Sequence, residues 1–293
     1  MGEPRSLLLV GHGSRSTAGV TECRQLARVV AELAPELPVE CGFIEFAPPD
    51  LDTAVDRLVT GGAQDVTAVP LVLLGAGHLK DDGPAALARA RYRHPGAGFR
   101  YGRDLGVHPL VLRVAEDRAR ATVQVIGGAA SSTAVVLVGR GSSDPDANGD
   151  LYKVARLLWD GRGFGAVEPA FVSLAAPGVG ATLDRCRQLG FAHIAVVPYF
   201  LFTGVLVDRI RAEAAEWAAS HPDVTVRVGP HLGPDPRVAR LVLERYEEAL
   251  SGDVRMNCDL CVYRLPLPGH EHKVRRAPGP HAHPHSHQPA ERG

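Results

Sequence analysis

The sequence predicts an α/β protein with two tandem, homologous, doubly wound parallel-sheet domains, followed by a disordered C-terminal tail. Three observations lead to this prediction: apolar strand-like runs alternate with amphipathic segments, the pattern occurs twice, and it stops near residue 255. Strand–helix alternation of this length is typical of βαβ units with a parallel sheet. The 293 residues, 45% of them hydrophobic, are enough for two such domains.

The repeat appears when the sequence is aligned with itself at an offset of 128 residues. Four blocks match in the same order: 7–16 with 135–144, 42–58 with 170–186, 66–79 with 194–207 and, after one deletion, 100–111 with 227–238. Accidental agreement of four ordered blocks is improbable. We therefore predict domains at 1–126 and 127–255, a Gly-rich linker at 126–133, and a tail at 256–293.

Within the first copy, strands and helices are expected to alternate strictly. The strands are predicted near 6–11, 39–45, 65–74 and 98–101, and the helices near 18–34, 50–60, 81–93 and 108–122. Pro84 falls in the first turn of the third helix, where a missing N–H costs little. In open sheets of this kind, ligands bind beyond the carboxyl ends of the strands.

Three side chains capable of metal or proton chemistry fall at that edge of the first copy. His12 follows the first strand, Glu45 ends the second, and His78 follows the third. Their counterparts in the second copy are Arg140, Ser173 and Leu206, whereas the surrounding scaffold is the same in both copies (Gly11/Gly139, Gly13/Gly141, Ser14/Ser142, Pro70/Pro198). One copy therefore has all three reactive groups and the other has none.

Two neutral imidazoles suit cobalt, nickel, iron or zinc, and a nearby carboxylate can take protons or orient a ring. Two histidines leave most coordination positions open, which suits a site that passes a metal on. The alternative is that each histidine caps a loop by bonding a backbone carbonyl. The GHGSR stretch at 11–15 is neither a nucleophile elbow, nor a dinucleotide fingerprint, nor a P-loop.

Composition excludes several other classes. A net charge of -1 and 5% aromatic residues argue against nucleic-acid binding. No apolar run is long enough to span a bilayer, and the N-terminus does not resemble a signal peptide, so we expect a cytoplasmic protein without a membrane partner. The five cysteines do not form a disulfide framework, and Cys23, Cys41 and Cys186 are predicted to be core residues.

The blocks LLLVGHGSR, GFIEFAPPDL, VPLVLLGAGHLKDDGP, LVGRGSSDPDAN and VVPYFLFTGVL resemble the sirohydrochlorin chelatases of the class II chelatase superfamily. The resemblance covers essentially the whole chain in the two-domain, single-polypeptide form. It implies insertion of a divalent metal into sirohydrochlorin, with cobalt for cobalamin or iron for sirohaem. It also implies that His12 and His78 are the paired metal-handling histidines and that Glu45 is an acidic residue of the same site.

The chemistry of such a substrate adds further candidates. A flat tetrapyrrole needs a cleft, which two facing domains supply, and its carboxylates need cations and N–H donors. The candidates for these contacts are Ser14, Arg15 and Lys80 on one side and Arg140, Ser142 and Ser143 on the other. Solvated surface charge is the alternative for each. We expect Gly11 and Gly13 to keep side chains away from the macrocycle.

The tail carries two further motifs, both of which the resemblance associates with long cobalt-directed members. Cys258 and Cys261 have C-x₂-C spacing, which fits one metal ion or one corner of an iron–sulfur cluster, or else an inert pair. The histidines at 281, 283, 285 and 287 predict metal collection, with a purification tag as the alternative (His281, His283, His285, His287).

The resemblance implies a sirohydrochlorin chelatase, and the tail motifs that it associates with cobalt-directed members favour Co²⁺ and thus a cobaltochelatase. A ferrochelatase using Fe²⁺ and a non-catalytic metal carrier remain as alternatives, and nickel is not separated from cobalt and iron by the histidine pair. The oligomeric state is left open, with a dimer as one option.

Overall fold

A computed structural model describes residues 4–76, 78–252 and 271–275 of the chain. It contains two sheets of four parallel strands with the same strand order, β2-β1-β3-β4 and β6-β5-β7-β8. The first sheet consists of β1 (Arg5–Gly11), β2 (Val39–Phe43), β3 (Asp65–Pro70) and β4 (Gly98–Tyr101). The second consists of β5 (Thr133–Gly139), β6 (Ala166–Phe171), β7 (His193–Pro198) and β8 (Thr225–Val228). The predicted fold class is confirmed.

Helices connect the strands in both repeats. The first repeat contains α1 (Thr17–Leu33), α2 (Leu51–Thr60), the π-helical turn η1 (His78–Asp82), α3 (Gly83–Arg93) and α4 (Pro109–Ile126). The second contains the 3₁₀ turn η2 (Ala130–Ser132), α5 (Pro145–Trp159), α6 (Val179–Gln188), α7 (Val205–Ser220) and α8 (Pro236–Ser251). A further 3₁₀ turn, η3, spans Glu271–Lys273. None of the helices in the described ranges is long and apolar enough to cross a membrane.

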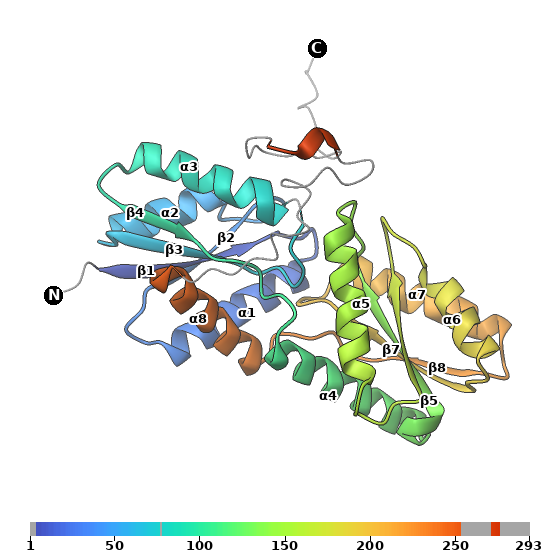
Figure 1. Ribbon diagram of the computed structural model, residues 1–293. Coiled ribbons are helices and arrows are strands. Elements are labelled where there is room, and N and C mark those ends of the chain that lie inside the picture. The colour runs from blue at the N-terminus through green and yellow to red at the C-terminus, as the bar shows by residue number, and fades with distance from the viewer. Residues whose placement is uncertain (1–3, 77, 253–270, 276–293) are drawn as a thin grey trace, which may run out of the picture.

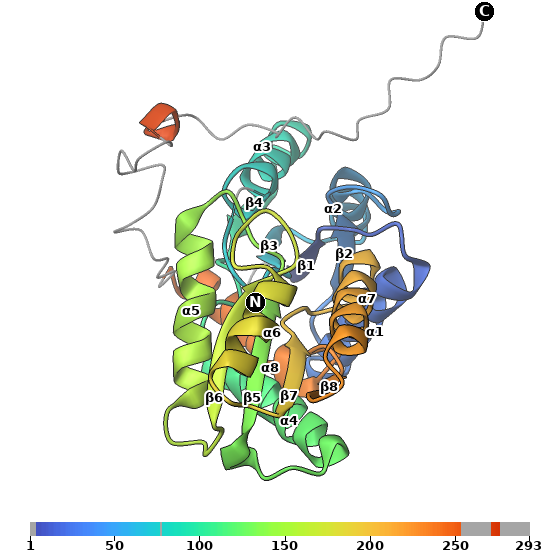
Figure 2. The same ribbon diagram turned by 90° about the vertical axis from the view of Figure 1, so that its right-hand side faces the viewer.

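The alternation of side chains along each central strand divides the core into layers. Leu7 and Leu9 of β1 face one layer, and Leu8 and Val10 face the other, because successive strand residues point to opposite sides of a sheet. The layer containing Leu8 is covered by α2 and α3, and α6 and α7 cover the corresponding face of the second sheet. Figure 2 shows α5 and α7 on opposite sides of that second sheet.

The last helix of each repeat packs on the sheet of the other repeat. α4 follows β4 in the sequence but lies against β7, β8 and α5, whereas α8 follows β8 but packs on α1, β3 and β4 (Figure 1). Arg245 of α8 is 1% exposed and donates to the carbonyl oxygens of Asp104 and Leu105 in the first repeat. The boundaries 1–126 and 127–255 thus describe the repeats, while each folded unit takes its final helix from the other repeat.

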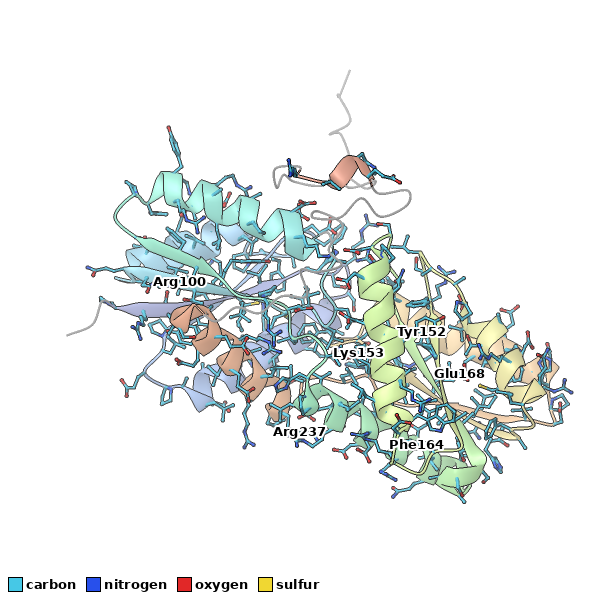
Figure 3. The ribbon with its side chains drawn as sticks, viewed as in Figure 1. Arg100, Tyr152, Lys153, Phe164, Glu168 and Arg237 are labelled. Atoms are coloured by element: carbon cyan, nitrogen blue, oxygen red, sulfur yellow. The ribbon has the colours of Figure 1, made fainter. Side chains whose placement is uncertain are left out.

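A group of charged side chains holds the two exchanged helices where they meet. Arg237, at the start of α8, donates to Asp117 of α4 at 2.6 Å and to Asp235 at 2.9 Å (Figure 3). Arg118 of α4 donates to the carbonyl oxygens of His231 and Leu232, which precede α8. One apolar layer also runs through both units and includes residues of α1, α4, α5 and α8.

Several element boundaries differ from the prediction. The second and third strands end at Phe43 and Pro70, and Glu45 and residues 71–74, which were expected to continue these strands, line a cavity instead. The predicted linker is a tight connection: α4 ends at Ile126, Gly127 caps it with φ 81°, and β5 begins at Thr133. Helices commonly end with a glycine in the left-handed conformation, so the glycines at 127 and 128 reflect the C-terminal cap of α4 and not a flexible linker.

Candidate active site

A cavity of about 730 Å³ lies between the two folded units, at the carboxyl ends of their central strands. We call it the interdomain cavity. Its walls come from matching loops of the two repeats: residues 11–15, 43–46 and 71–76 on one side and residues 139–143, 171–174 and 199–207 on the other, with all but a few positions in these ranges contributing. This is the sheet edge at which parallel α/β folds bind ligands.

His12 and Glu45 meet at the wall of the first unit. His12 Nδ1 lies 3.4 Å from Glu45 Oε1, and the two side chains are 32% and 17% exposed. Their loops are joined directly, since Glu45 N donates to the His12 carbonyl oxygen at 3.0 Å. A carboxylate on one ring nitrogen orients an imidazole and raises its basicity. The geometry therefore leads us to assign Nε2 as the ring nitrogen that would meet a metal.

The glycines beside His12 serve the contact between these loops. A Cβ atom at Gly13, where φ is +93°, would lie 1.7 Å from the Glu45 carbonyl oxygen. A Cβ atom at Gly11 would lie 2.9 Å from the Phe43 ring. Gly141 repeats the pattern, with Ser173 O at 2.2 Å. Gly13 thus allows two backbone segments to touch, and Gly11 makes room for the Phe43 ring, while both glycines also line the interdomain cavity. Their expected role of keeping side chains away from a macrocycle stays a prediction.

His78 is the first residue of η1, two residues after Ala76, which lines the interdomain cavity. The side chain of His78 lies outside the described part of the chain. In the second repeat, the matching residues begin the regular helix α7. Single π-helical turns often occur at functional sites. Within residues 4–76, 78–252 and 271–275, no three His, Cys, Asp or Glu side chains are grouped so that they could hold a metal.

The opposite wall carries Arg140, Ser142 and Ser143, as the repeat comparison expects. The loop is braced by Asn148, whose side chain exchanges two hydrogen bonds with the backbone of Ser142 at 2.8 and 2.9 Å. The Ser142 hydroxyl accepts from Asp144 N, just as the Ser14 hydroxyl accepts from Ser16 N in the first repeat. Both hydroxyls therefore keep their own proton to donate to a ligand.

Lys80, one of the cations that the sequence suggests for substrate binding, is not among the residues that line the interdomain cavity. Its ammonium lies 2.6 Å from Asp144 Oδ2 and 4.0 Å from Asp146 Oδ2 in the second repeat. The Lys80 and Asp144 side chains are 9% and 4% exposed. Lys80 thus ties the turn that carries His78 to the start of α5, where Asp144 caps the helix.

Sequence reasoning missed much of the cavity wall. The apolar residues Phe46 and Leu174 occupy equivalent positions in the two repeats and line the interdomain cavity from its two sides. The residues at 199–207 add a further, largely apolar stretch. Phe46 and Leu174 could have been identified as large apolar residues at equivalent positions of two Pro-containing loops. Both lie in the aligned blocks 42–58 and 170–186.

The cysteine predictions divide into two groups. Cys23, Cys41 and Cys186 are buried free thiols, as expected, and Cys23 Sγ lies 3.5 Å from Cys41 Sγ. Burial raises the pKa of Cys186 to about 12, so this thiol stays protonated. Cys258, Cys261 and the histidines at 281–287 lie outside the described residues.

The CbiX family model matches residues 6–122 and 134–249 of the chain. The sirohydrochlorin cobaltochelatase of Priestia megaterium is 38% identical over 266 residues, which cover 91% of this chain and 87% of that protein. The sirohydrochlorin ferrochelatase of Bacillus subtilis (strain 168) is 32% identical over 248 residues, which cover 83% of this chain and 91% of that protein.

Solved structures match over the same extent. SirB from Bacillus subtilis with Fe³⁺ superposes with a TM-score of 0.74 at 30% identity, covering 86% of this chain and 99% of that one. The sirohydrochlorin chelatase SirB from Bacillus subtilis subspecies spizizenii, in complex with cobalt, superposes with a TM-score of 0.69 at 29% identity, covering 85% and 96%.

Proposed function

The chain belongs to the CbiX family, and we propose that it is a sirohydrochlorin cobaltochelatase, which inserts a divalent metal into sirohydrochlorin with Co²⁺ preferred. The observation that carries this proposal is the asymmetry of the interdomain cavity. One wall presents His12 and Glu45, whereas the opposite wall has Arg140 at the position equivalent to His12, and Ser173, the equivalent of Glu45, is not among the residues that line the cavity. A metal-handling wall and a cationic wall thus face the same space. The macrocycle and the metal ion are both substrates.

The reaction exchanges two pyrrolic protons for one metal ion. His12 Nε2, together with His78, would hold the partly dehydrated metal at the cavity wall. Glu45 orients the His12 ring through Nδ1 and is placed to accept a proton released by the macrocycle. The products are the metallated macrocycle and two protons, so charge and atoms balance.

The opposite wall is proposed to hold the carboxylates at the macrocycle edge. Arg140 supplies a guanidinium, which pairs with carboxylates in bidentate geometry, and Ser142 and Ser143 supply hydroxyl donors. From the first unit, Ser14 supplies a hydroxyl donor and Arg15 supplies a guanidinium. Apolar side chains fill much of the remaining wall, as a broad, flat ring requires.

The test is anaerobic metal insertion into sirohydrochlorin with Co²⁺, Fe²⁺ and Ni²⁺ in parallel, followed by the macrocycle absorption spectrum. We expect His12→Ala and His78→Ala each to lower kcat by at least about tenfold, because each removes a metal ligand or proton acceptor. Arg140→Ala should chiefly raise KM for sirohydrochlorin. A carrier without catalysis would leave the insertion rate at that of the metal-only blank.

The Fe²⁺ alternative is decided by the same assay. Relatives named as cobaltochelatase and as ferrochelatase both match the chain, and an imidazole pair does not separate the two metals by affinity alone. Faster insertion of Fe²⁺ than of Co²⁺ at equal free concentration would favour the ferrochelatase alternative. A cytoplasmic location remains a prediction.

We propose separate roles for the two tail motifs. The histidines at 281–287 collect metal, so removal of residues 256–293 should slow insertion only when metal is scarce. Inactivity of the truncated protein in excess cobalt would contradict this role. Cys258 and Cys261 bind a metal ion or one corner of an iron–sulfur cluster, so anaerobically isolated protein should lose bound metal when both become Ser.

A further inference from the structure

Phe46 and Leu174 are two large apolar side chains at equivalent positions in the repeats, and neither is buried. They are 43% and 66% exposed, and both line the interdomain cavity, one from each folded unit. Their preceding neighbours differ, since Glu45 corresponds to Ser173. The carboxylate that contacts His12 is thus present in one copy only, whereas an exposed apolar side chain at the following position is present in both.

The backbone at both positions is strained. Phe46 and Leu174 have φ values of 63° and 51°, and within the described ranges the only other non-glycine residue with positive φ is Arg275. Each is the central residue of a three-residue turn: Ala47 N donates to Glu45 O at 2.8 Å, and Ala175 N donates to Ser173 O at 2.5 Å. Turns of this type with positive φ are rare, and a bulky residue there is disfavoured relative to glycine. Strain of this kind tends to occur at functional sites.

The Phe46 ring has a defined setting beside the metal-handling group. Its centroid lies 6.3 Å from that of the His12 imidazole, with an interplanar angle of 17°. The Arg15 guanidinium carbon lies 5.0 Å from the same centroid on the Phe46 ring. An apolar surface, a cation and an imidazole therefore occur together at one wall of the cavity.

We propose that Phe46 and Leu174 grip the apolar face of the tetrapyrrole from the two folded units and thereby determine the affinity for the macrocycle. The proposal rests on the proposed function. Contact with the face of the macrocycle removes the apolar side chains of Phe46 and Leu174 from water, which favours binding. The adjacent Arg15 can pair with a carboxylate at the edge of the macrocycle. The sharp turns hold both tips out in the cavity, where they stay exposed until the macrocycle arrives.

The test replaces each tip with the residue that its backbone prefers. Phe46→Gly and Leu174→Gly remove the side chain and also relieve the positive-φ strain, so the unfolding midpoint in urea should stay the same or rise. The dissociation constant of metal-free sirohydrochlorin, measured by fluorescence titration, should rise about tenfold for each variant, as expected for loss of a stacking contact. The kcat for cobalt insertion at saturating sirohydrochlorin should stay within about twofold. Phe46→Leu should restore most of the affinity.

Two exposed apolar residues away from the cavity provide matched controls. Tyr92 of α3 is 90% exposed and Leu189 at the end of α6 is 57% exposed, and neither lines the interdomain cavity. Tyr92→Ala and Leu189→Ala should leave sirohydrochlorin affinity unchanged. The Co²⁺ affinity measured without sirohydrochlorin should be the same in Phe46→Gly and in the wild type, because the tip acts on the macrocycle and not through His12.

The outcomes separate this proposal from the proposed function. Unchanged sirohydrochlorin affinity in both glycine variants, with a wild type that binds and metallates sirohydrochlorin, would overturn the grip alone. A Co²⁺ affinity that falls in parallel with sirohydrochlorin affinity would also overturn it, since Phe46 would then act through His12. A wild-type chain that does not bind sirohydrochlorin would overturn both proposals.

Discussion

Gly13 allows the loops that carry His12 and Glu45 to touch, because it has no side chain. Its hydrogen faces the Glu45 carbonyl oxygen, at a place where a Cβ atom would approach to 1.7 Å. The same backbone contact carries the hydrogen bond from Glu45 N to His12 O, so the distance between the His12 and Glu45 side chains depends on it. The absence of a side chain at Gly13 therefore determines how closely the His12 and Glu45 loops approach.

We therefore predict that Gly13→Ala destabilises the protein by at least about 2 kcal/mol, because it adds a backbone clash and a positive-φ penalty. It should also lower kcat by separating His12 from Glu45. Urea denaturation and the cobalt-insertion assay measure the two effects. Gly149 of α5 is the control, since nothing lies within 4 Å of its Cβ position, and Gly149→Ala should stabilise by about 0.5–1 kcal/mol. Equal stability of the two variants would contradict this account.

Asp104 lies where the first repeat meets α8. The pKa of Asp104 is raised to about 6, chiefly by burial and to a smaller extent by the nearby Asp150 carboxylate, although Arg103 and a hydrogen bond from the Gly75 backbone oppose the shift. A carboxyl with a raised folded-state pKa binds its proton more tightly in the folded protein. Its contribution to stability is therefore complete below about pH 4 and is lost as the pH rises through about 6.

The substitution Asp104→Asn should accordingly stabilise the protein at pH 8 by on the order of 2 kcal/mol relative to wild type and have little effect at pH 4. The measurement is the free energy of unfolding in urea at both pH values. Asp208→Asn, at an exposed site of α7, is the control and should change stability by less than about 0.5 kcal/mol. A gain from Asp104→Asn that is larger at pH 4 than at pH 8 would contradict the sign of the effect.

At the scale of elements, the clearest difference between the repeats is the start of the third helix. In the second repeat α7 begins at Val205 as a regular helix, whereas the matching residues of the first repeat form the π-helical turn η1 before α3. Lys80 of this turn is buried against Asp144, which caps α5 in the other repeat. The element that carries His78 is therefore positioned by a contact with the second folded unit.

Lys80→Met should destabilise the protein by roughly 3–5 kcal/mol, because it leaves Asp144 buried without its cation. Adding Asp144→Asn should recover much of this loss, since asparagine keeps the helix cap while removing the charge. The exposed pair Arg209–Glu213 on α7 is the control, and Arg209→Met should cost less than about 0.5 kcal/mol. The measurement is the urea unfolding free energy of these three variants and the wild type, and an equal loss in Lys80→Met and Arg209→Met would contradict a buried pair.

At the scale of the whole molecule, the exchange of α4 and α8 makes the two repeats depend on each other. Each sheet is covered by the final helix of the other repeat, and one apolar layer continues through both units. Figure 1 shows α8, the last helix of the second repeat, beside α1 at the start of the first repeat, and α4 of the first repeat beside α5 of the second. The interdomain cavity is thereby built on a shared core and not on two independently stable halves.

We predict that residues 1–126 expressed alone do not form a stable monomer, because α8 is missing from the first sheet and α4 has no second sheet to cover. Co-expression with residues 127–252 should give a complex of one copy of each fragment. Size-exclusion chromatography with light scattering, together with urea unfolding, distinguishes the results. A cooperatively folding monomer of residues 1–126 would contradict the dependence.

Much of the architecture was predictable from the sequence because it rests on local and repeated patterns. The alternation of Leu7 to Val10 is set by the two faces of a strand, and the matching offset of 128 residues gives the second sheet. His12 and Glu45 were expected at one edge because parallel strands end together, and the structure places them 3.4 Å apart. The role of His78 stays a prediction.

The fold class, the duplication and the sheet edge at which His12 and Glu45 meet follow from the sequence alone. Three features required the folded chain: the sheet that α4 and α8 each cover, the burial of Lys80 against Asp144, and the position of Phe46 and Leu174 in the wall of the interdomain cavity. Hydrophobic periodicity indicates which face of a helix is buried, but it does not identify the element against which that face packs. Likewise, a cation or an apolar residue in a loop has no partner until segments distant in the sequence pack together.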